Sequence, residues 1–130
     1  MEFGDVGDGG RMKRSKRARA TDFSAKSRKE IMLRDRGRCI FCEAGYHMGK
    51  ATPFEMELKE IMHYIPRSAG GLGIPQNAAV GCKYHHVMYD NGNEGRHDEM
   101  KGIFAECLNR IYAGWNEKDL VYNKWKYLEG

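Results

Sequence analysis

Two short pairs of residues with zinc-binding side chains lie far apart in the sequence. Cys39 and Cys42 form a Cys-x-x-Cys pair, and Cys82 and His85 form a Cys-x-x-His pair. A tetrahedral zinc site takes four such ligands, and four protein ligands leave no open position for catalysis. The sequence therefore predicts a structural Zn²⁺ that joins two segments separated by the 39 residues 43–81. The alternative, unrelated pairs with a histidine in the core, stays open at this point.

A second group of residues could carry acid–base and metal chemistry on a phosphodiester. An imidazole has an ordinary pKa of about 6.5, so His63 can accept a proton near neutral pH. His86 and Asp90 are four residues apart in a predicted helix, so both side chains face one side and could share a divalent cation. Such a cation stabilises the charge on the phosphorus centre and on the departing oxygen. Arg67 could hold the phosphate with two parallel hydrogen bonds, and a solvent-facing loop arginine is the alternative.

The order and spacing of these residues resemble the HNH endonuclease family, specifically its compact bacterial and phage members with a zinc knuckle. The likeness covers roughly residues 17–92. It rests on a histidine followed by Pro-Arg-Ser-x-Gly-Gly within residues 60–71, on Asn77, and on the Cys-x-x-His-His run that starts at Cys82. The resemblance implies an α+β fold with a ββα-metal (His-Me finger) core.

The resemblance also implies a role for each matched residue. His63 matches the general base that takes a proton from the attacking water. Asn77 matches the residue that braces the loop between the strands and keeps that histidine oriented. His86 matches a ligand of the single catalytic divalent metal, which is Mg²⁺, Mn²⁺ or Ni²⁺. The four Cys and His residues match the structural zinc ligands, with His85 standing where many members have a cysteine.

One position departs from the family pattern. Many members have Asp or His as a metal ligand immediately before the general base, but this sequence has Met62. A thioether is a poor ligand for Mg²⁺. We therefore expect His86 and Asp90 to hold the ion together with water and substrate phosphate, and Met62→Asp to add a ligand.

Positive charge is concentrated near the N-terminus. The chain carries a net charge of +4, yet residues 11–38 hold 12 Lys or Arg and 3 Asp or Glu, a net charge of +9. Such a segment suits a polyanion, most simply DNA, because each phosphate contact releases counterions; a solvated tail is the alternative. The candidate DNA-binding residues are Lys13, Arg14, Lys16, Arg17, Arg19 and Arg67.

The elements that must position these groups can be predicted from hydrophobic pattern and turn residues. We expect a disordered basic arm over residues 1–23 and one domain over 24–130, with a core at 24–92 and a helical cap at 93–130. Within them we expect a basic helix (24–35), an irregular loop (43–56), strands (58–65 and 78–81) and helices (83–90, 100–112 and a last one from Trp115 through Trp125).

Composition limits the classes of protein to which this sequence can belong. The sequence has no apolar run long enough to span a bilayer and no secretory signal, which predicts a cytoplasmic protein of a bacterium or a phage-infected cell. Together these features predict metal-dependent hydrolysis of DNA by a protein of phage or prophage origin. Two alternatives stay open: a non-catalytic, zinc-stabilised DNA-binding module, and a structural zinc domain in phage packaging whose basic arm contacts packaging proteins.

Overall fold

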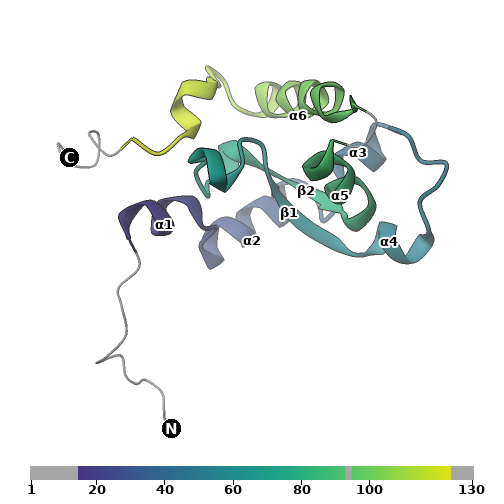
Figure 1. Cartoon of the computed structure of the whole chain (residues 1–130). Coiled ribbons are helices and arrows are strands. Elements are labelled where there is room, and N and C mark those ends of the chain that lie inside the picture. Colours follow the sequence, from purple (N-terminus) through teal and green to yellow (C-terminus); the bar gives the residue numbers. More distant parts are fainter. Residues whose placement is uncertain (1–14, 93–94, 124–130) are drawn as a thin grey trace, which may run out of the picture.

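The computed structural model describes residues 15–92 and 95–123 and shows a small α+β protein around a two-stranded antiparallel hairpin (Figure 1). Strand β1 (Lys59–His63) pairs with β2 (Ala78–Cys82) in a register that sets His63 opposite Ala78. Helix α5 (Lys83–Asn91) begins immediately after β2 and packs against both strands. The end of β1, the end of β2 and the start of α5 therefore carry most of the residues singled out above.

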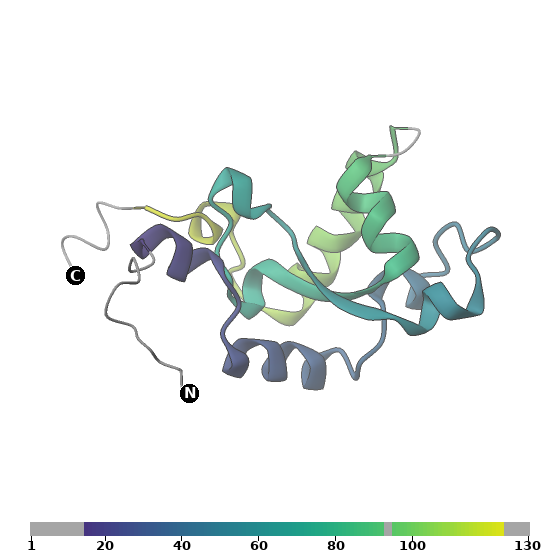
Figure 2. The same ribbon diagram turned by 60° about the horizontal axis from the view of Figure 1, so that its bottom comes forward.

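Helices cover the hairpin on both faces. Side chains alternate between the two faces of a strand. On one face, Val80 of β2 packs with Ile31 of α2 (Ala25–Arg34). On the other, Met62 of β1 packs in the larger core cluster with Phe104 of α6 (His97–Ile111). Figures 1 and 2 show α2 on one side of the hairpin and α5 with α6 on the other. The hairpin is thus buried between two layers of helices.

A partly buried ion pair ties α2 to the hairpin. The Arg34 guanidinium contacts both carboxylate oxygens of Asp35, at 2.7 and 3.0 Å, and also donates to the carbonyl oxygens of Pro75 and Ala78. Asp35 in turn accepts a hydrogen bond from the Val80 amide at 2.9 Å. Because every donor has a partner, this pair satisfies polar groups that would otherwise be left unpaired between the layers.

The predicted helices at 24–35, 83–90 and 100–112 and both predicted strands are confirmed, each within a few residues of its expected ends. Helix α2 begins as expected after Ser24, whose hydroxyl accepts a hydrogen bond from the Ser27 amide. The short helix α3 (Ile40–Glu43) forms at the predicted knuckle, with Cys39 as its N-cap.

Two expected irregular regions contain helices. Residues 43–56 were predicted to form a loop, but α4 (Pro53–Glu57) lies at its end because Thr52 and Glu55 form a reciprocal capping box. The disordered arm predicted over 1–23 is wrong for α1 (Lys16–Thr21), which Ser15 caps and which docks on the folded body. Residues 1–14, including Lys13 and Arg14, lie outside the described residues.

The last predicted helix is shorter than expected. Residues Glu117–Leu120 form a 3₁₀ helix, η5, after which Val121 pairs with Gly71 in an antiparallel bridge. The Leu120 carbonyl and the Tyr122 amide, on either side of Val121, therefore bond to Leu72 and Gly70 instead of continuing a helix. Trp125 lies outside the described residues.

The loop that follows His63 is held by both ends of the described chain. It contains the 3₁₀ helices η2 (Arg67–Ala69) and η3 (Pro75–Asn77). The Gly73 amide donates to the Ala20 carbonyl at 2.9 Å, and the Tyr122 amide donates to the Gly70 carbonyl at 2.8 Å.

No helix in the described parts of the chain is long and apolar enough to cross a membrane.

Candidate functional site

The four predicted zinc ligands lie together beneath the start of α5. Their ligand atoms are all within 4.8 Å of one another. His85 Nδ1 lies 3.7, 3.6 and 3.4 Å from the sulfurs of Cys39, Cys42 and Cys82. Zinc bonds of about 2.3 Å to sulfur and about 2.0 Å to nitrogen set tetrahedral ligand atoms about 3.5 to 3.8 Å apart. This cluster could therefore hold a zinc ion.

The surroundings of the cluster favour metal binding. His85 Nε2 lies 2.6 Å from the Tyr46 carbonyl oxygen, which can only accept a hydrogen bond, so the lone pair is on Nδ1, which faces the sulfurs. Burial raises the pKa of the Cys39 and Cys42 thiols, and buried thiolates need a cation to offset their charge. Cys107, the fourth cysteine, lies on α6 outside this cluster.

The next residue of α5, His86, lies between two carboxylates. Its Nδ1 is 2.6 Å from Glu60 Oε1 on β1, and its Nε2 is 3.2 Å from Asp90 Oδ2 one turn along α5. The His86 side chain is 23% exposed and that of Asp90 is 60% exposed, so water and a phosphate can reach both. The structure therefore brings His86 and Asp90 together as predicted and adds Glu60.

This arrangement fits a divalent cation on the Asp90 side. Two ligand atoms at right angles on an octahedral ion with bonds of about 2.1 Å lie about 3.0 Å apart, close to the 3.2 Å between His86 Nε2 and Asp90 Oδ2. A carboxylate on the other ring nitrogen, as Glu60 provides, is the usual partner of a metal-binding histidine. His86 and Asp90 supply two ligands, so water and substrate would complete the shell.

His63 ends β1 and is held from the N-terminal side of the chain. Its Nε2 lies 2.9 Å from the Thr21 carbonyl oxygen, and its ring packs on Phe23 with centroids 4.3 Å apart. Burial lowers the pKa of His63, and the charge of Arg67 lowers it further, while Asp90 and the Thr21 carbonyl oppose that shift. The imidazole is therefore neutral near pH 7 and lies within electrostatic range of the α5 residues.

Asn77 is fully buried and bonds to the loop that follows His63. Its Oδ1 accepts from the Ile65 amide at 2.8 Å, and its Nδ2 donates to the carbonyls of Ile65 and Leu72 at 3.1 and 2.8 Å. The side chain therefore crosslinks the two ends of the loop. The polar contact that the structure gives His63 itself is with Thr21, so Asn77 acts on the histidine through the backbone.

Met62 does not lie where a metal ligand would be needed. Its side chain is fully buried in the larger core cluster. It also fills the space beside Gly81, where an added Cβ would come within 2.4 Å of the Met62 sulfur. The expectation that Met62→Asp would add a ligand is therefore contradicted. The carboxylate that reaches His86 comes instead from Glu60, two residues earlier on the same side of the strand.

The described basic candidates gather near the loop after His63. Arg67 forms an ion pair with Asp22 at 2.7 Å, with its own side chain 55% exposed. Arg17 Nη2 lies 3.5 Å from the Ser68 carbonyl oxygen. Lys16 and Arg19 are exposed on α1. Docking of α1 thus places positive charge beside His63.

Sequence reasoning missed two partners of the histidines. Glu60 is three residues before His63, and strand alternation could have placed it on one face with position 62. Nothing in the sequence could have identified the Thr21 carbonyl as a partner of His63, because every residue has a backbone carbonyl group. Only the docked position of α1 directs this one toward His63.

Comparisons with known proteins show a fold likeness. No protein-family model matches the chain, and no curated protein matches it. Among solved structures, it is similar to the Type IV phosphorothioation-dependent restriction endonuclease ScoMcrA, with a TM-score of 0.51 and 19% sequence identity. The match covers 68% of this chain and 17% of that one, so it shows a similar fold over a small part of a much longer protein.

Proposed function

We propose that this protein is a metal-dependent DNA endonuclease of the HNH type, with β1, β2 and α5 forming a ββα-metal core. The observation that carries the proposal is that His86 is held between Glu60 and Asp90 beside a hairpin whose first strand ends in a neutral, half-buried histidine, His63. A purely structural zinc domain has no need for this second set of groups.

His63 is the proposed general base. The Thr21 carbonyl can only accept a hydrogen bond, so Nε2 of His63 carries the proton and Nδ1 holds the lone pair. Nδ1 can then take a proton from the water that attacks the phosphorus. Because burial lowers the pKa of His63, the imidazole is unprotonated and ready to act at neutral pH.

His86 and Asp90 are the proposed ligands of the catalytic divalent metal. Glu60 accepts a hydrogen bond from Nδ1 of His86, which fixes the ring and directs the Nε2 lone pair toward Asp90. When bound, a divalent cation supplies charge stabilisation for the phosphorus centre and the leaving oxygen. Asn77 holds the loop that leads away from His63, so the base keeps its place relative to α5.

DNA is the proposed substrate because of the charge around the site. Arg67 and the exposed basic residues of α1 lie on the same side as His63 and can contact the phosphates on either side of the scissile one. The structural neighbour is by its title a restriction endonuclease, which is consistent with this substrate. The structural zinc ion would hold α3 and the start of α5 together.

The test is incubation of the purified protein with supercoiled plasmid and Mg²⁺, Mn²⁺ or Ni²⁺. We expect metal-dependent nicking that His63→Ala and His86→Ala each abolish. His97→Ala is the histidine control, since the His97 ring packs on the Tyr89 ring and bonds to the Tyr89 carbonyl group. Salt-sensitive DNA binding without nicking would instead identify a DNA-binding module. Absence of both would leave a structural zinc domain.

A further inference from the structure

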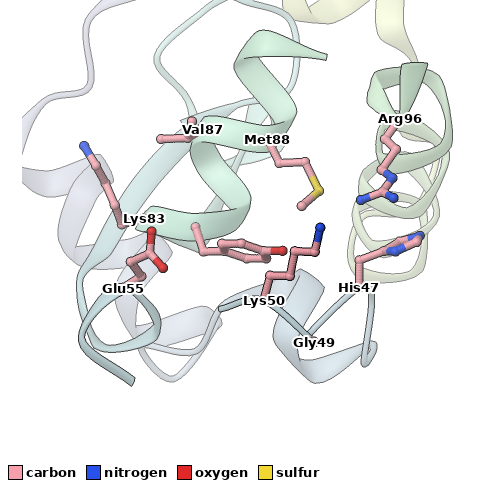
Figure 3. Close-up of a pocket in the computed structure, with 9 residues that line it drawn as sticks. His47, Gly49, Lys50, Glu55, Lys83, Val87, Met88 and Arg96 are labelled. Carbon is pink, nitrogen blue, oxygen red and sulfur yellow. The ribbon is translucent and has the colours of Figure 1, made fainter. Parts of the chain in front are cut away.

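A recess lies beside α5, away from His86. It has a volume of about 520 Å³ and is formed by the 47–50 segment, α4, α5 and the residue before α6 (Figure 3). Its floor on α5 includes Tyr84 and Met88. Each of these is two residues from His86, which is about 200° around a helix. The recess and the candidate catalytic site thus lie on opposite sides of one helix.

Positive side chains gather in this recess although the body of the protein is acidic. Residues 39–130 contain ten Lys or Arg residues, and three of them, Lys50, Lys83 and Arg96, line it. Figure 3 shows the nitrogen ends of Lys50 and Arg96 turned toward each other across the opening, whereas the His47 ring points toward α6. This grouping of donors suits an anion with several oxygens.

The acidic groups nearby are engaged by neighbours. Glu55, which lines the recess, accepts hydrogen bonds from the amide and hydroxyl of Thr52 at 3.1 and 3.0 Å. Glu99 of α6 accepts a hydrogen bond from the Tyr46 hydroxyl and lies 3.9 Å from Nε2 of His47, which lines the recess. These contacts offset part of the negative charge that would oppose an incoming anion.

The segment that supplies Lys50 and His47 is anchored to the zinc cluster. The Tyr46 carbonyl oxygen accepts the hydrogen bond from His85 Nε2, and the Tyr46 ring packs on Phe41 with centroids 6.1 Å apart. These contacts fix the start of the segment that carries the donors, and such preorganisation lowers the entropic cost of binding.

Lys83 and Val87 form the ridge of α5 between the recess and the candidate catalytic site. Lys83 Nζ lies 3.9 Å from Glu60 Oε2, whose other oxygen contacts His86. In Figure 3 the Lys83 side chain points away from the opening of the recess. A DNA strand lying across this ridge would contact positively charged side chains from one side of α5 to the other.

We propose that the recess binds a backbone phosphate of the DNA strand whose scissile phosphate lies at His86. This proposal rests on the proposed function and adds to it a second contact point across α5. Lys50 and Arg96 hold the phosphate, while Val87 and Met88 contact the attached sugar. The recess is open and Lys50 is exposed, which suits a phosphate within a long chain better than a small molecule that needs enclosure.

Salt-dependent DNA binding tests the proposal without relying on cleavage. The full chain carrying His63→Ala is titrated with a short DNA duplex between 50 and 200 mM salt, alone and with Lys50→Gln and Arg96→Gln combined. We expect the double variant to weaken binding by about 10-fold and to reduce the slope of log affinity against log salt by about 1 to 2. Lys118→Gln on η5 is the control, since it removes a positive charge at the opposite end of the molecule from α4 (Figure 1).

Several outcomes would overturn the proposal. An unchanged slope in the double variant, or an equal loss in Lys118→Gln, would mean that the recess is not a phosphate site. If DNA binding is unchanged but inorganic phosphate shifts the NMR signals of Lys50 and Arg96, the ligand is a free anion instead. Plasmid nicking is measured separately. If the protein does not nick plasmid but the double variant still reduces the slope of log affinity against log salt, only the proposed function is refuted.

Discussion

Nε2 of His63 lies 2.9 Å from the backbone carbonyl oxygen of Thr21, a residue 42 positions earlier in the chain. This contact makes the end of α1 and the residues that follow it part of the candidate catalytic site. The same segment supplies Phe23 against the His63 ring and Asp22 against Arg67. Under the proposed function, the N-terminal region therefore has two roles: its basic side chains contact DNA, and its backbone orients the general base.

Gly73→Ala tests the role of this segment without changing any catalytic group. A Cβ on Gly73 would lie 2.2 Å from the Asp22 carbonyl oxygen and 2.7 Å from the Phe23 nitrogen, so the segment must move. We expect the rate constant for nicking to fall by about 10- to 100-fold because His63 loses its orientation. Plasmid nicking at saturating DNA measures this. Gly102→Ala, with no atom within 4 Å of the added Cβ, is the control, and equal rates for both variants would refute the role.

The pH dependence of nicking should reflect the environment of His63. Burial lowers its pKa and the Arg67 charge lowers it further, so the neutral form persists to lower pH than for a free imidazole, with its pKa of about 6.5. We expect the acidic limb of kcat/KM below that value. Arg67→Gln should move the limb to higher pH, because it removes a charge that disfavours protonation. A limb that stays in place would mean that His63 is not the titrating base.

Glu60→Gln should weaken binding of the catalytic metal while leaving zinc in place. The amide keeps an acceptor for Nδ1 of His86 but loses the negative charge that makes the ring a better ligand. We expect the Mg²⁺ concentration for half-maximal nicking to rise by about 10-fold. Glu57→Gln, an exposed carboxylate at the end of α4, is the matched control. A rise in both variants would indicate a general charge effect.

Met62→Asp should destabilise the protein instead of completing the metal shell. The side chain is fully buried against Gly81 and the α6 side of the core, and an unpaired carboxylate there costs several kcal/mol, of the order of 3 to 5. Urea denaturation measures the loss, with Met62→Leu as the apolar control. A stably folded Met62→Asp protein that nicks at lower Mg²⁺ would show that position 62 faces the ion after all.

Zinc should be bound at one ion per chain and should be required for folding. The four ligands come from α3 and from the junction of β2 and α5, so loss of the ion would leave buried thiols and detach these elements. Cys82→Ser should lower zinc to under about half an equivalent by elemental analysis and reduce helical circular dichroism. Cys107→Ser should keep both. A folded, zinc-free Cys82→Ser protein would refute a structural role.

The sequence was most informative where chemistry depends on residue type and spacing. The pairs at Cys39 and Cys82 and the four-residue interval from His86 to Asp90 could be read directly, and the structure brings each set together. Ser24 and the alternation along β1 similarly predicted a helix start and a strand. In these places the relevant interactions are local.

The errors arose where tertiary contacts decide the outcome. Six residues of α1 would be only marginally stable alone, and their helix persists because it docks on the loop at Gly73. The family pattern places position 62 at the metal, and alternation alone cannot say which side chains of β1 the core buries; Met62 is fully buried. The capping box at Thr52 and Glu55 was visible in the sequence, but a helix of five residues lacks a hydrophobic period.

The pairing of Gly71 with Val121 sets an order of events during synthesis. Every zinc ligand and both candidate catalytic histidines precede residue 87, so they leave the ribosome well before Val121. The loop after His63, however, receives its backbone partners from Leu120 and Tyr122 only once residues 120–122 have emerged. A nascent chain can therefore acquire its metal clamp before the contacts that hold this loop in place can form. Hydrolytic competence would therefore follow metal binding in the growing polypeptide.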